Sequence, residues 1–294
     1  MDLQIKTGLP DERILDVSID GPEDAVPLLF HNGTPSSGQL YDPFVEAASQ
    51  RGLRMVSFSR AGYGNSTRNP GRRVASVIPD VAAILDHLGA HRYYTLGWSG
   101  GGPHALACAA LLPDRLIGAA TVGCLAPYEA EGLNWMAGMG QENVESFHAA
   151  LAGDTALRTF LERAASWAAN ATPDQVAASL GDLVSDADRS AISGESAAWL
   201  ADVFRESVRN GIWGWYDDEV AFVRPWGFDV RNINVPVAIW QGAQDRTTPF
   251  AHGEWLALHI PGVRPHLLPD HGHLSLGVNS FGLLLDDLLT VAPA

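Results

Sequence analysis

The sequence has little of what several common protein classes require. Only two cysteines occur in 294 residues, so we expect no disulfide framework and interpret Cys108 and Cys124 as small buried apolar side chains. No run of about 18 apolar residues is present, and the first residues lack the cationic and apolar regions of a signal peptide. These absences predict a soluble, cytoplasmic protein without a membrane partner.

Positive charge is also scarce. Lysine and arginine together number 19 against 34 acidic residues, which gives a net charge of −15, and Lys6 is the only lysine. Nucleic acids and anionic membranes bind positive surfaces, so we expect neither as a partner. A lysine Schiff base in the middle of the chain is excluded.

Signatures of bound cofactors are missing as well. No pair of histidines with a carboxylate shows metal-ligand spacing, and no Gly-x-Gly-x-x-Gly follows the first predicted strand. We therefore expect no metal and no other cofactor. The expected partner is a small-molecule ester or amide substrate. We expect the protein itself to be a monomer or a homodimer.

The most informative stretch is Gly97-Trp98-Ser99-Gly100-Gly101. The apolar and β-branched residues 93–96 before it are typical of a strand, and the Ala/Leu-rich residues 103–112 after it are typical of a helix. A serine at a sharp strand-to-helix turn, with glycines two residues before and after it, predicts a nucleophile elbow.

Strands and helices alternate around this turn. The predicted strands cover residues 13–19, 26–30, 53–58, 93–96, 115–123, 235–240 and 264–268. Helices are predicted over residues 41–51, 74–88, 103–112, 248–259 and the last segment of the chain. This alternation of near-continuous apolar strands with helices predicts an α/β fold with a parallel sheet that helices cover on both faces.

The alternation stops between residues 126 and 226, where helical patterns occur without a convincing strand. Helices are predicted over residues 143–151, 154–169, 173–180 and 195–210. We interpret residues 126–226 as a helical cap inserted into a core made of residues 1–125 and 227–294. Part of the cap's aromatic side chains should pack it onto the sheet, and the others should roof an apolar pocket. The pocket candidates are Trp98, Trp135, Met139, Trp199 and Trp213.

Ligands of open parallel sheets bind beyond the carboxyl ends of the strands, where four predicted features meet. Ser99, Asp245, His273 and the loop around Thr34 each follow a predicted strand. A serine hydroxyl needs an adjacent base, an imidazole suits that task, and a carboxylate behind it fixes its tautomer. The backbone N–H groups of Thr34 and Gly100 are the candidate oxyanion donors.

Two of these assignments have competitors. Asp245 could instead be a turn residue that caps the next helix, and His271 lies two residues before His273. We favour His273 because Gly272 allows a turn that presents it at the start of the last predicted helices.

With these motifs in hand, the chain resembles the α/β-hydrolase superfamily over nearly its whole length. The resemblance lies in the elbow, in Gly272-His273 and in the motifs at residues 32–35, 59–66 and 242–249. It implies an eight-stranded, mostly parallel sheet with a helical cap after the sixth strand, and a Ser99, Asp245 and His273 triad. Asn32 stands where the family usually has a histidine. Dehalogenases and epoxide hydrolases of this superfamily carry aspartate at the elbow, so the chain looks most like the capped esterase and proline-iminopeptidase branch.

The expected activity is hydrolysis of carboxylic esters of small to medium apolar substrates through an acyl-serine. An aminopeptidase would need a carboxylate for the substrate's ammonium, and the candidates are Glu129, Glu131, Asp217 and Asp218, although such charged runs are usually solvated faces. Acyl transfer or carbon–carbon bond hydrolysis would use the same triad. A ligand-binding receptor on this fold is the alternative that is not an enzyme.

Overall fold

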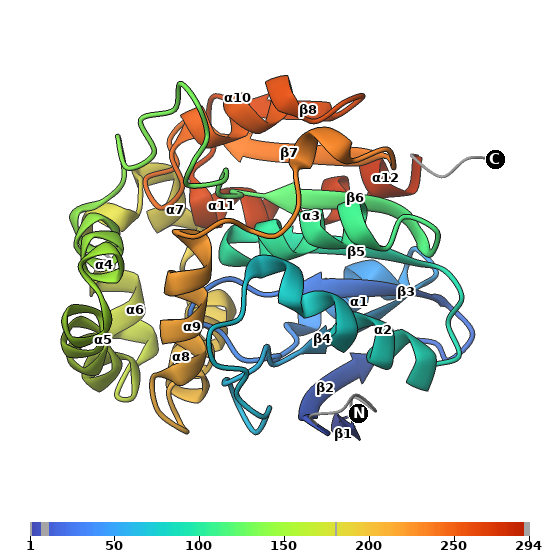
Figure 1. The fold of residues 1–294 in the computed structure, drawn as a ribbon, viewed down its shortest axis with the longest axis horizontal. Helices are drawn as coiled ribbons and strands as arrows, with labels where there is room; N and C mark the ends of the chain where they lie inside the picture. The colour runs from blue at the N-terminus through green and yellow to red at the C-terminus, as the bar shows by residue number, and fades with distance from the viewer. Residues whose placement is uncertain (1, 7–11, 180, 291–294) are drawn as a thin grey trace.

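The computed structural model, which describes residues 2–6, 12–179 and 181–290, contains one eight-stranded sheet (Figure 1). The strand order is β1-β2-β4-β3-β5-β6-β7-β8. The strand β2 pairs antiparallel with β1 and β4, and the other neighbours pair in parallel. The strands are β1 (Asp2–Lys6), β2 (Ile14–Asp20), β3 (Val26–His31), β4 (Leu53–Phe58), β5 (Tyr93–Trp98), β6 (Leu116–Val122), β7 (Val237–Gly242) and β8 (Arg264–Leu268). The predicted eight-stranded, mostly parallel sheet is confirmed.

Helices cover both faces of the sheet, as predicted. One face carries α1 (Asp42–Ser49), α11 (His273–Asn279) and α12 (Phe281–Thr290). The other face carries the 3₁₀ turn η1 (Val74–Val77), α2 (Ile78–His87), α3 (Gly102–Leu111) and α10 (Phe250–His259). The central strands are buried on both faces, which explains why they are continuous apolar runs without alternation.

The first strand was not predicted. Of the five residues of β1, only Ile5 is buried and Leu3 is half-buried, so its apolar alternation consists of two residues and is too short to predict a strand. Its extended form depends on antiparallel pairing with β2 at the edge of the sheet. A strand that depends on such pairing carries only a weak signal in its own short sequence.

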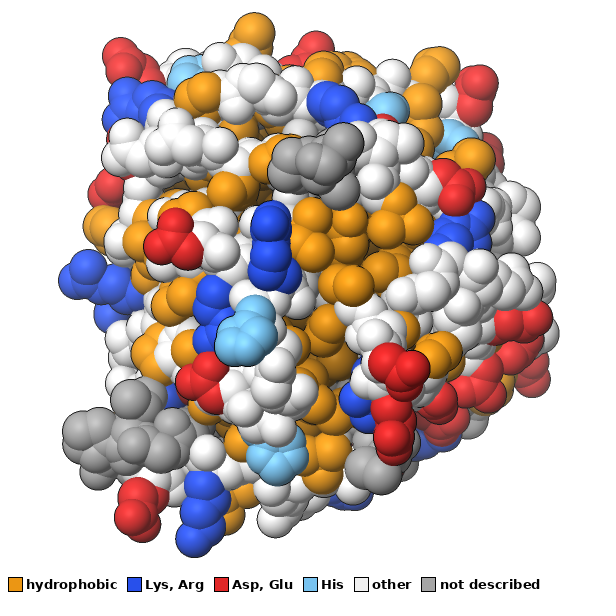
Figure 2. All heavy atoms as spheres, turned by 90° about the vertical axis from the view of Figure 1, so that its right-hand side faces the viewer, with side chains coloured by type: hydrophobic (Ala, Val, Ile, Leu, Met, Phe, Trp, Pro, Cys, Tyr) orange, Lys and Arg blue, Asp and Glu red, His pale blue; other side chains and the backbone are white. Residues whose placement is uncertain are grey.

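The side of the molecule turned to the right in Figure 1 faces the viewer in Figure 2. Basic and acidic side chains are interspersed on this face, with hydrophobic side chains between them. Among the atoms that are described there, no continuous band of one charge is present. In the described part of the chain, no helix is long and apolar enough to cross a membrane.

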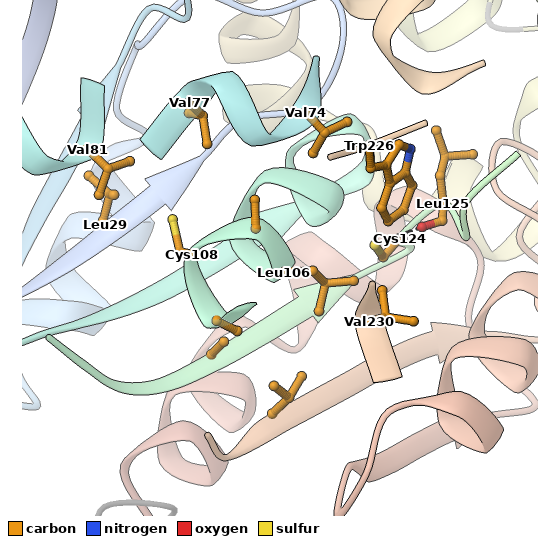
Figure 3. Packing of buried hydrophobic residues seen from close by; sticks show 14 of the residues in the cluster. Leu29, Val74, Val77, Val81, Leu106, Cys108, Cys124, Leu125, Trp226 and Val230 are labelled. Atoms are coloured by element: carbon orange, nitrogen blue, oxygen red, sulfur yellow. Dashed lines mark hydrogen bonds between the residues drawn. The ribbon is translucent and has the colours of Figure 1, made fainter. Parts of the chain in front are cut away.

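Both cysteines are buried in the hydrophobic cluster that packs α2 and α3 against the sheet (Figure 3). Cys108 lies on α3, and Cys124 follows β6 beside Leu125. Burial raises the pKa of the Cys108 thiol to about 12 and raises that of Cys124 as well. The two thiols therefore behave as the small apolar groups that the sequence predicted.

A helical segment, α4 to α9, lies between β6 and β7 and groups on one side of the sheet (Figure 1). Its helices are α4 (Gln141–Ala152), α5 (Asp154–Ala168), α6 (Pro173–Ser179), α7 (Asp186–Ala191), α8 (Gly194–Ser207) and α9 (Trp213–Phe222). All six fall within the predicted cap of residues 126–226, whose status as a separate domain stays a prediction. Neither α7 nor α9 was predicted.

Three consecutive acids of α9 explain why this helix was missed. Asp217, Asp218 and Glu219 are all buried, with 2%, 0% and 6% of each residue exposed. Acidic residues in a row usually form a solvated face, and this prediction is wrong here. They are tolerated inside the protein because two of them pair with arginines, Asp217 with Arg68 and Asp218 with two others.

Asp218 joins α9 to the core through a fully buried ion-pair network. Its carboxylate lies 2.6 Å from the guanidinium nitrogens of both Arg60 and Arg72. It also accepts hydrogen bonds from the hydroxyls of Tyr63 at 3.0 Å and Thr34 at 2.8 Å. Burial opposes its charge, but the two guanidinium groups hold the pKa of the carboxyl well below its ordinary value.

The backbone of α9 approaches the core closely beside this network. A Cβ on Gly214 would lie 2.5 Å from the Tyr63 ring, and a Cβ on Gly62 would lie 2.9 Å from the Gly214 nitrogen. Gly62 has a φ of 93°, which favours glycine for a second reason. These two glycines allow α9 to sit directly on the loop after β4.

We expect Asp218→Asn to lower the free energy of unfolding by about 3–5 kcal/mol, because it leaves two buried arginines without their counter-ion. Urea denaturation followed by circular dichroism measures the change. Asp286→Asn is the control, since its pair with Arg51 lies at the surface and should contribute little. An equally small loss for both variants would contradict a structural role of the network.

Candidate active site

Ser99 occupies the turn between β5 and α3 with a strained backbone. Its φ is 56°, and apart from Glu12 it is the only described non-glycine residue with a positive φ. The 3₁₀ turn η2 (Ser99–Gly101) then leads directly into α3. A serine held in this conformation at the end of a central strand presents its hydroxyl above the sheet, as the elbow motif predicts.

The glycines around Ser99 are required by close backbone contacts. A Cβ on Gly97 would collide with the Gly101 carbonyl, and a Cβ on Gly101 would collide with the His31 carbonyl. A Cβ on Gly100 would collide with the Thr34 hydroxyl, which places the elbow against the loop after β3. The two candidate oxyanion residues, Thr34 and Gly100, are therefore neighbours.

His273 and Asp245 form a buried pair beside this turn. His273 Nδ1 lies 2.7 Å from Asp245 Oδ2, and 4% of each residue is exposed. The other carboxylate oxygen, Oδ1, accepts hydrogen bonds from the backbone N–H groups of Thr247 at 2.9 Å and Thr248 at 2.7 Å. Asp245 therefore stabilises the turn that follows it with one oxygen and pairs with His273 through the other. The turn-residue interpretation and the histidine-partner interpretation of Asp245 are thus compatible.

The loop after β3 is fixed by Arg60. Its guanidinium donates to the carbonyl oxygens of Asn32 at 2.5 Å and Gly33 at 2.8 Å. The C=O and the next N–H of a trans peptide point in opposite directions. Holding the Gly33 carbonyl against Arg60 therefore turns the Thr34 N–H away from Arg60.

Ser99, His273 and the loop after β3 line one cavity of about 330 Å³ between the sheet and the helical segment. Ser99, His273, Thr34 and Trp98 contribute from the core. The helical segment contributes mainly aromatic and aliphatic side chains, among them Phe160, Trp167, Trp199, Leu200, Phe204 and Trp215. A largely apolar cavity with a few convergent polar groups is typical of a small-molecule site.

Residues 26–280 match the profile of the α/β-hydrolase fold family. The chain belongs to this family. A non-heme haloperoxidase from Rhodococcus erythropolis is 25% identical over 86% of this chain and 88% of its own length. Epoxide hydrolase B from Mycobacterium tuberculosis is 31% identical, but the match spans 48% of this chain and 41% of that protein. The chain thus spans less than half the length of that relative.

Solved structures of this fold align over nearly the whole chain. An esterase from Exiguobacterium antarcticum has a TM-score of 0.70 at 17% identity, covering 99% of this chain and 98% of its own. A bromoperoxidase from Bacillus anthracis has a TM-score of 0.69 at 20% identity, covering 98% and 99%. At these identities the likeness shows the fold alone.

Three of the five predicted pocket residues of this α/β-hydrolase lie outside the cavity. Trp135 donates its indole N–H to the Ala126 carbonyl and packs on Phe147, so it belongs to the core. Met139 is buried in the same cluster. Trp213 stacks against the Arg68 guanidinium, 3.9 Å from its ring centroid. Trp98 and Trp199 line the cavity as predicted.

The acids considered for an ammonium site also lie elsewhere. Glu129 and Glu131 are exposed, and Asp217 and Asp218 are paired with arginines. None of the four lines the cavity. His271, the competitor of His273, is not bonded to Asp245; its backbone carbonyl accepts from Gln244.

The sequence analysis missed Asp188, which lies on α7 and is completely buried. Its carboxylate accepts hydrogen bonds from the backbone N–H groups of His273 at 3.0 Å and of Leu274 and Ser275 at 2.8 Å each. Asp188 therefore caps the N-terminus of α11, the helix that begins with His273. A Cβ on Gly272 would collide with this carboxylate, so Gly272 permits the cap.

Electrostatics around His273 favour the imidazolium. Burial alone would lower the pKa of His273, but Asp245, through its charge and its hydrogen bond, and the charge of Asp188 raise it above the ordinary 6.5. Gly123 makes room for this arrangement, because a Cβ there would lie 2.7 Å from His273 Nδ1.

We expect Asp188→Asn to lower the pKa of His273 and to reduce the free energy of unfolding by about 1–3 kcal/mol. The amide keeps only one oxygen, so at least one buried N–H group of α11 loses its acceptor. Nuclear magnetic resonance titration of the His273 ring and urea denaturation measure the two effects. Asp186→Asn, on the exposed side of the same helix, is the matched control. An unchanged His273 pKa in Asp188→Asn would contradict the electrostatic coupling.

Proposed function

We propose that this α/β-hydrolase cleaves carboxylic esters of small to medium apolar substrates through an acyl-serine intermediate. The observation that carries the proposal is the meeting of Ser99, on its strained turn, with the buried His273–Asp245 pair at one apolar cavity. In chain order, these residues follow the Ser, Asp, His sequence that the fold requires.

The proposed reaction begins when His273 takes the proton of the Ser99 hydroxyl and the oxygen attacks the ester carbonyl. The N–H groups of Thr34 and Gly100 stabilise the oxyanion, and Arg60 orients the first of them through the Gly33 carbonyl. The imidazolium then protonates the leaving alcohol. A water molecule, deprotonated by His273, releases the acid and restores Ser99.

The named relatives include enzymes with other activities, and the identity of the nucleophile argues against one of these activities, epoxide hydrolysis. Opening an epoxide through a covalent ester requires a carboxylate at the elbow, whereas this chain has Ser99. Ester cleavage uses the hydroxyl directly.

We expect a fluorophosphonate probe to form a single adduct on Ser99, which mass spectrometry of the intact protein and its peptides detects. Ser99→Ala should lose both the adduct and the turnover of p-nitrophenyl esters, and butyrate should be cleaved faster than octanoate because the cavity is small. Ser207→Ala is the matched control, since Ser207 is buried in α8 outside the cavity. Turnover that survives in Ser99→Ala would contradict the proposal; an adduct without turnover would favour a receptor.

We expect kcat/KM to fall as the pH drops through a pKa above 6.5, because only neutral His273 accepts the serine proton. In Asp245→Asn this limb should move to lower pH, and kcat should fall roughly 1,000-fold or more. The measurement is a pH–rate profile with p-nitrophenyl butyrate. The same profile for Glu219→Gln identifies the limb, since Glu219 lines the cavity and burial raises its pKa to about 7. A limb that disappears in Glu219→Gln would contradict its assignment to His273.

A further inference from the structure

Glu219 is the one acid of α9 that faces the cavity. It is 6% exposed, and its Oε1 accepts a hydrogen bond from the Trp215 indole at 3.1 Å. Its other oxygen, Oε2, forms no hydrogen bond of standard geometry with the described residues, although Ser146 lies beside it. A buried carboxylate oxygen without a good donor is costly, so the cavity offers a place for a ligand's donor.

Apart from His273, whose charge is paired with Asp245, the ionisable groups that line the cavity are carboxylates. Glu142, on the first turn of α4, lines it together with Glu219. None of the described residues that line it is a lysine or an arginine, and its one histidine is His273. Three arginines of the loop after β4 pair with the neighbouring acids Asp217 and Asp218 of α9, and none of them lines the cavity. A carboxylate-bearing ligand would therefore be repelled from the cavity, and a cation attracted.

The walls of the cavity add a second preference for a cation. Trp167, Trp199, Trp215, Phe160 and Phe204 all line it. Aromatic faces attract organic cations, most strongly where water is excluded. Carboxylates combined with aromatic walls are suited to an alkylammonium. Its charge and N–H groups match the carboxylates, and its carbon chain matches the aromatic walls.

We propose that the cavity binds an alkylammonium group, with Glu219 accepting its N–H through the unpartnered Oε2 and the aromatic walls enclosing its alkyl chain. The proposal rests on the proposed ester hydrolysis and adds a substrate class to it, namely esters that carry an amine. The acceptor of the ammonium is then Glu219, with Glu142 as a second negative charge on the cavity lining, and not one of the four acids that the sequence indicated.

The experiment is isothermal titration of the wild-type protein with three probes of equal chain length, hexylammonium, 1-hexanol and hexanoate. The titration is done at a pH well above 7, because burial raises the pKa of Glu219 to about 7 and the proposal requires its ionised form. None of them is an ester, so the measurement does not depend on turnover. We expect hexylammonium to bind roughly tenfold more tightly than 1-hexanol, as hydrogen bonds to charged groups allow, and hexanoate to bind most weakly.

Two variants test whether the preference for hexylammonium over 1-hexanol depends on Glu219. Glu219→Gln keeps the acceptor for the Trp215 indole and should bind hexylammonium no better than 1-hexanol, while its unchanged affinity for 1-hexanol shows that the cavity is intact. Glu145→Gln removes an exposed acid of α4 that does not line the cavity, and should keep the preference.

Equal binding of hexylammonium and 1-hexanol by the wild type would overturn the proposal, and so would a preference that survives in Glu219→Gln. The wild-type ranking decides the matter even where Glu219→Gln fails to fold. An absence of ester turnover would refute the proposed function and leave the ammonium site standing, so the two failures are distinguishable.

Discussion

The ion pairs of Asp218 with Arg60 and Arg72 hold the candidate site in one arrangement. Asp218 comes from the helical segment, and the two arginines come from the loop after β4. Through Arg60 the same network fixes the carbonyls of Asn32 and Gly33, and with them the peptide of Thr34. The loop beside the Ser99 turn therefore depends on a charge that the helical segment supplies.

The geometry of Arg60 explains why a guanidinium serves at this position. One planar group donates to a carboxylate, a hydroxyl and two backbone carbonyls at the same time. An ammonium has three donors around a single point and does not match this fork of acceptors. Burial of the Arg60 guanidinium is tolerated because each of its three nitrogens has an acceptor in a matching position.

Local sequence signals were sufficient for the core and for nominating Ser99, Asp245 and His273 as candidates. Ser99 directly follows β5, and Asp245 and His273 lie within a few residues of the ends of β7 and β8, so the pattern and the topology together place them at one edge of the sheet. The carboxylates of the helical segment leave no such signal. Asp218 meets Arg60 across 158 residues, and Asp188 meets the His273 backbone across 85. Read locally, both look like solvated acids, because their burial depends on partners that only the folded chain provides. Trp135 and Met139 show the converse, since their apolar side chains suit the core and a pocket wall equally well.

The cap that Asp188 places on α11 couples the packing of α7 to the position of α11 by thermodynamic linkage. Its carboxylate reaches the three N–H groups only while α7 is packed against α11. Packing and capping therefore share a single coupling free energy, which acts equally in both directions. A change that loosens α7 lowers the population in which the His273 backbone is held, and a change that disorders α11 loosens α7 to the same extent.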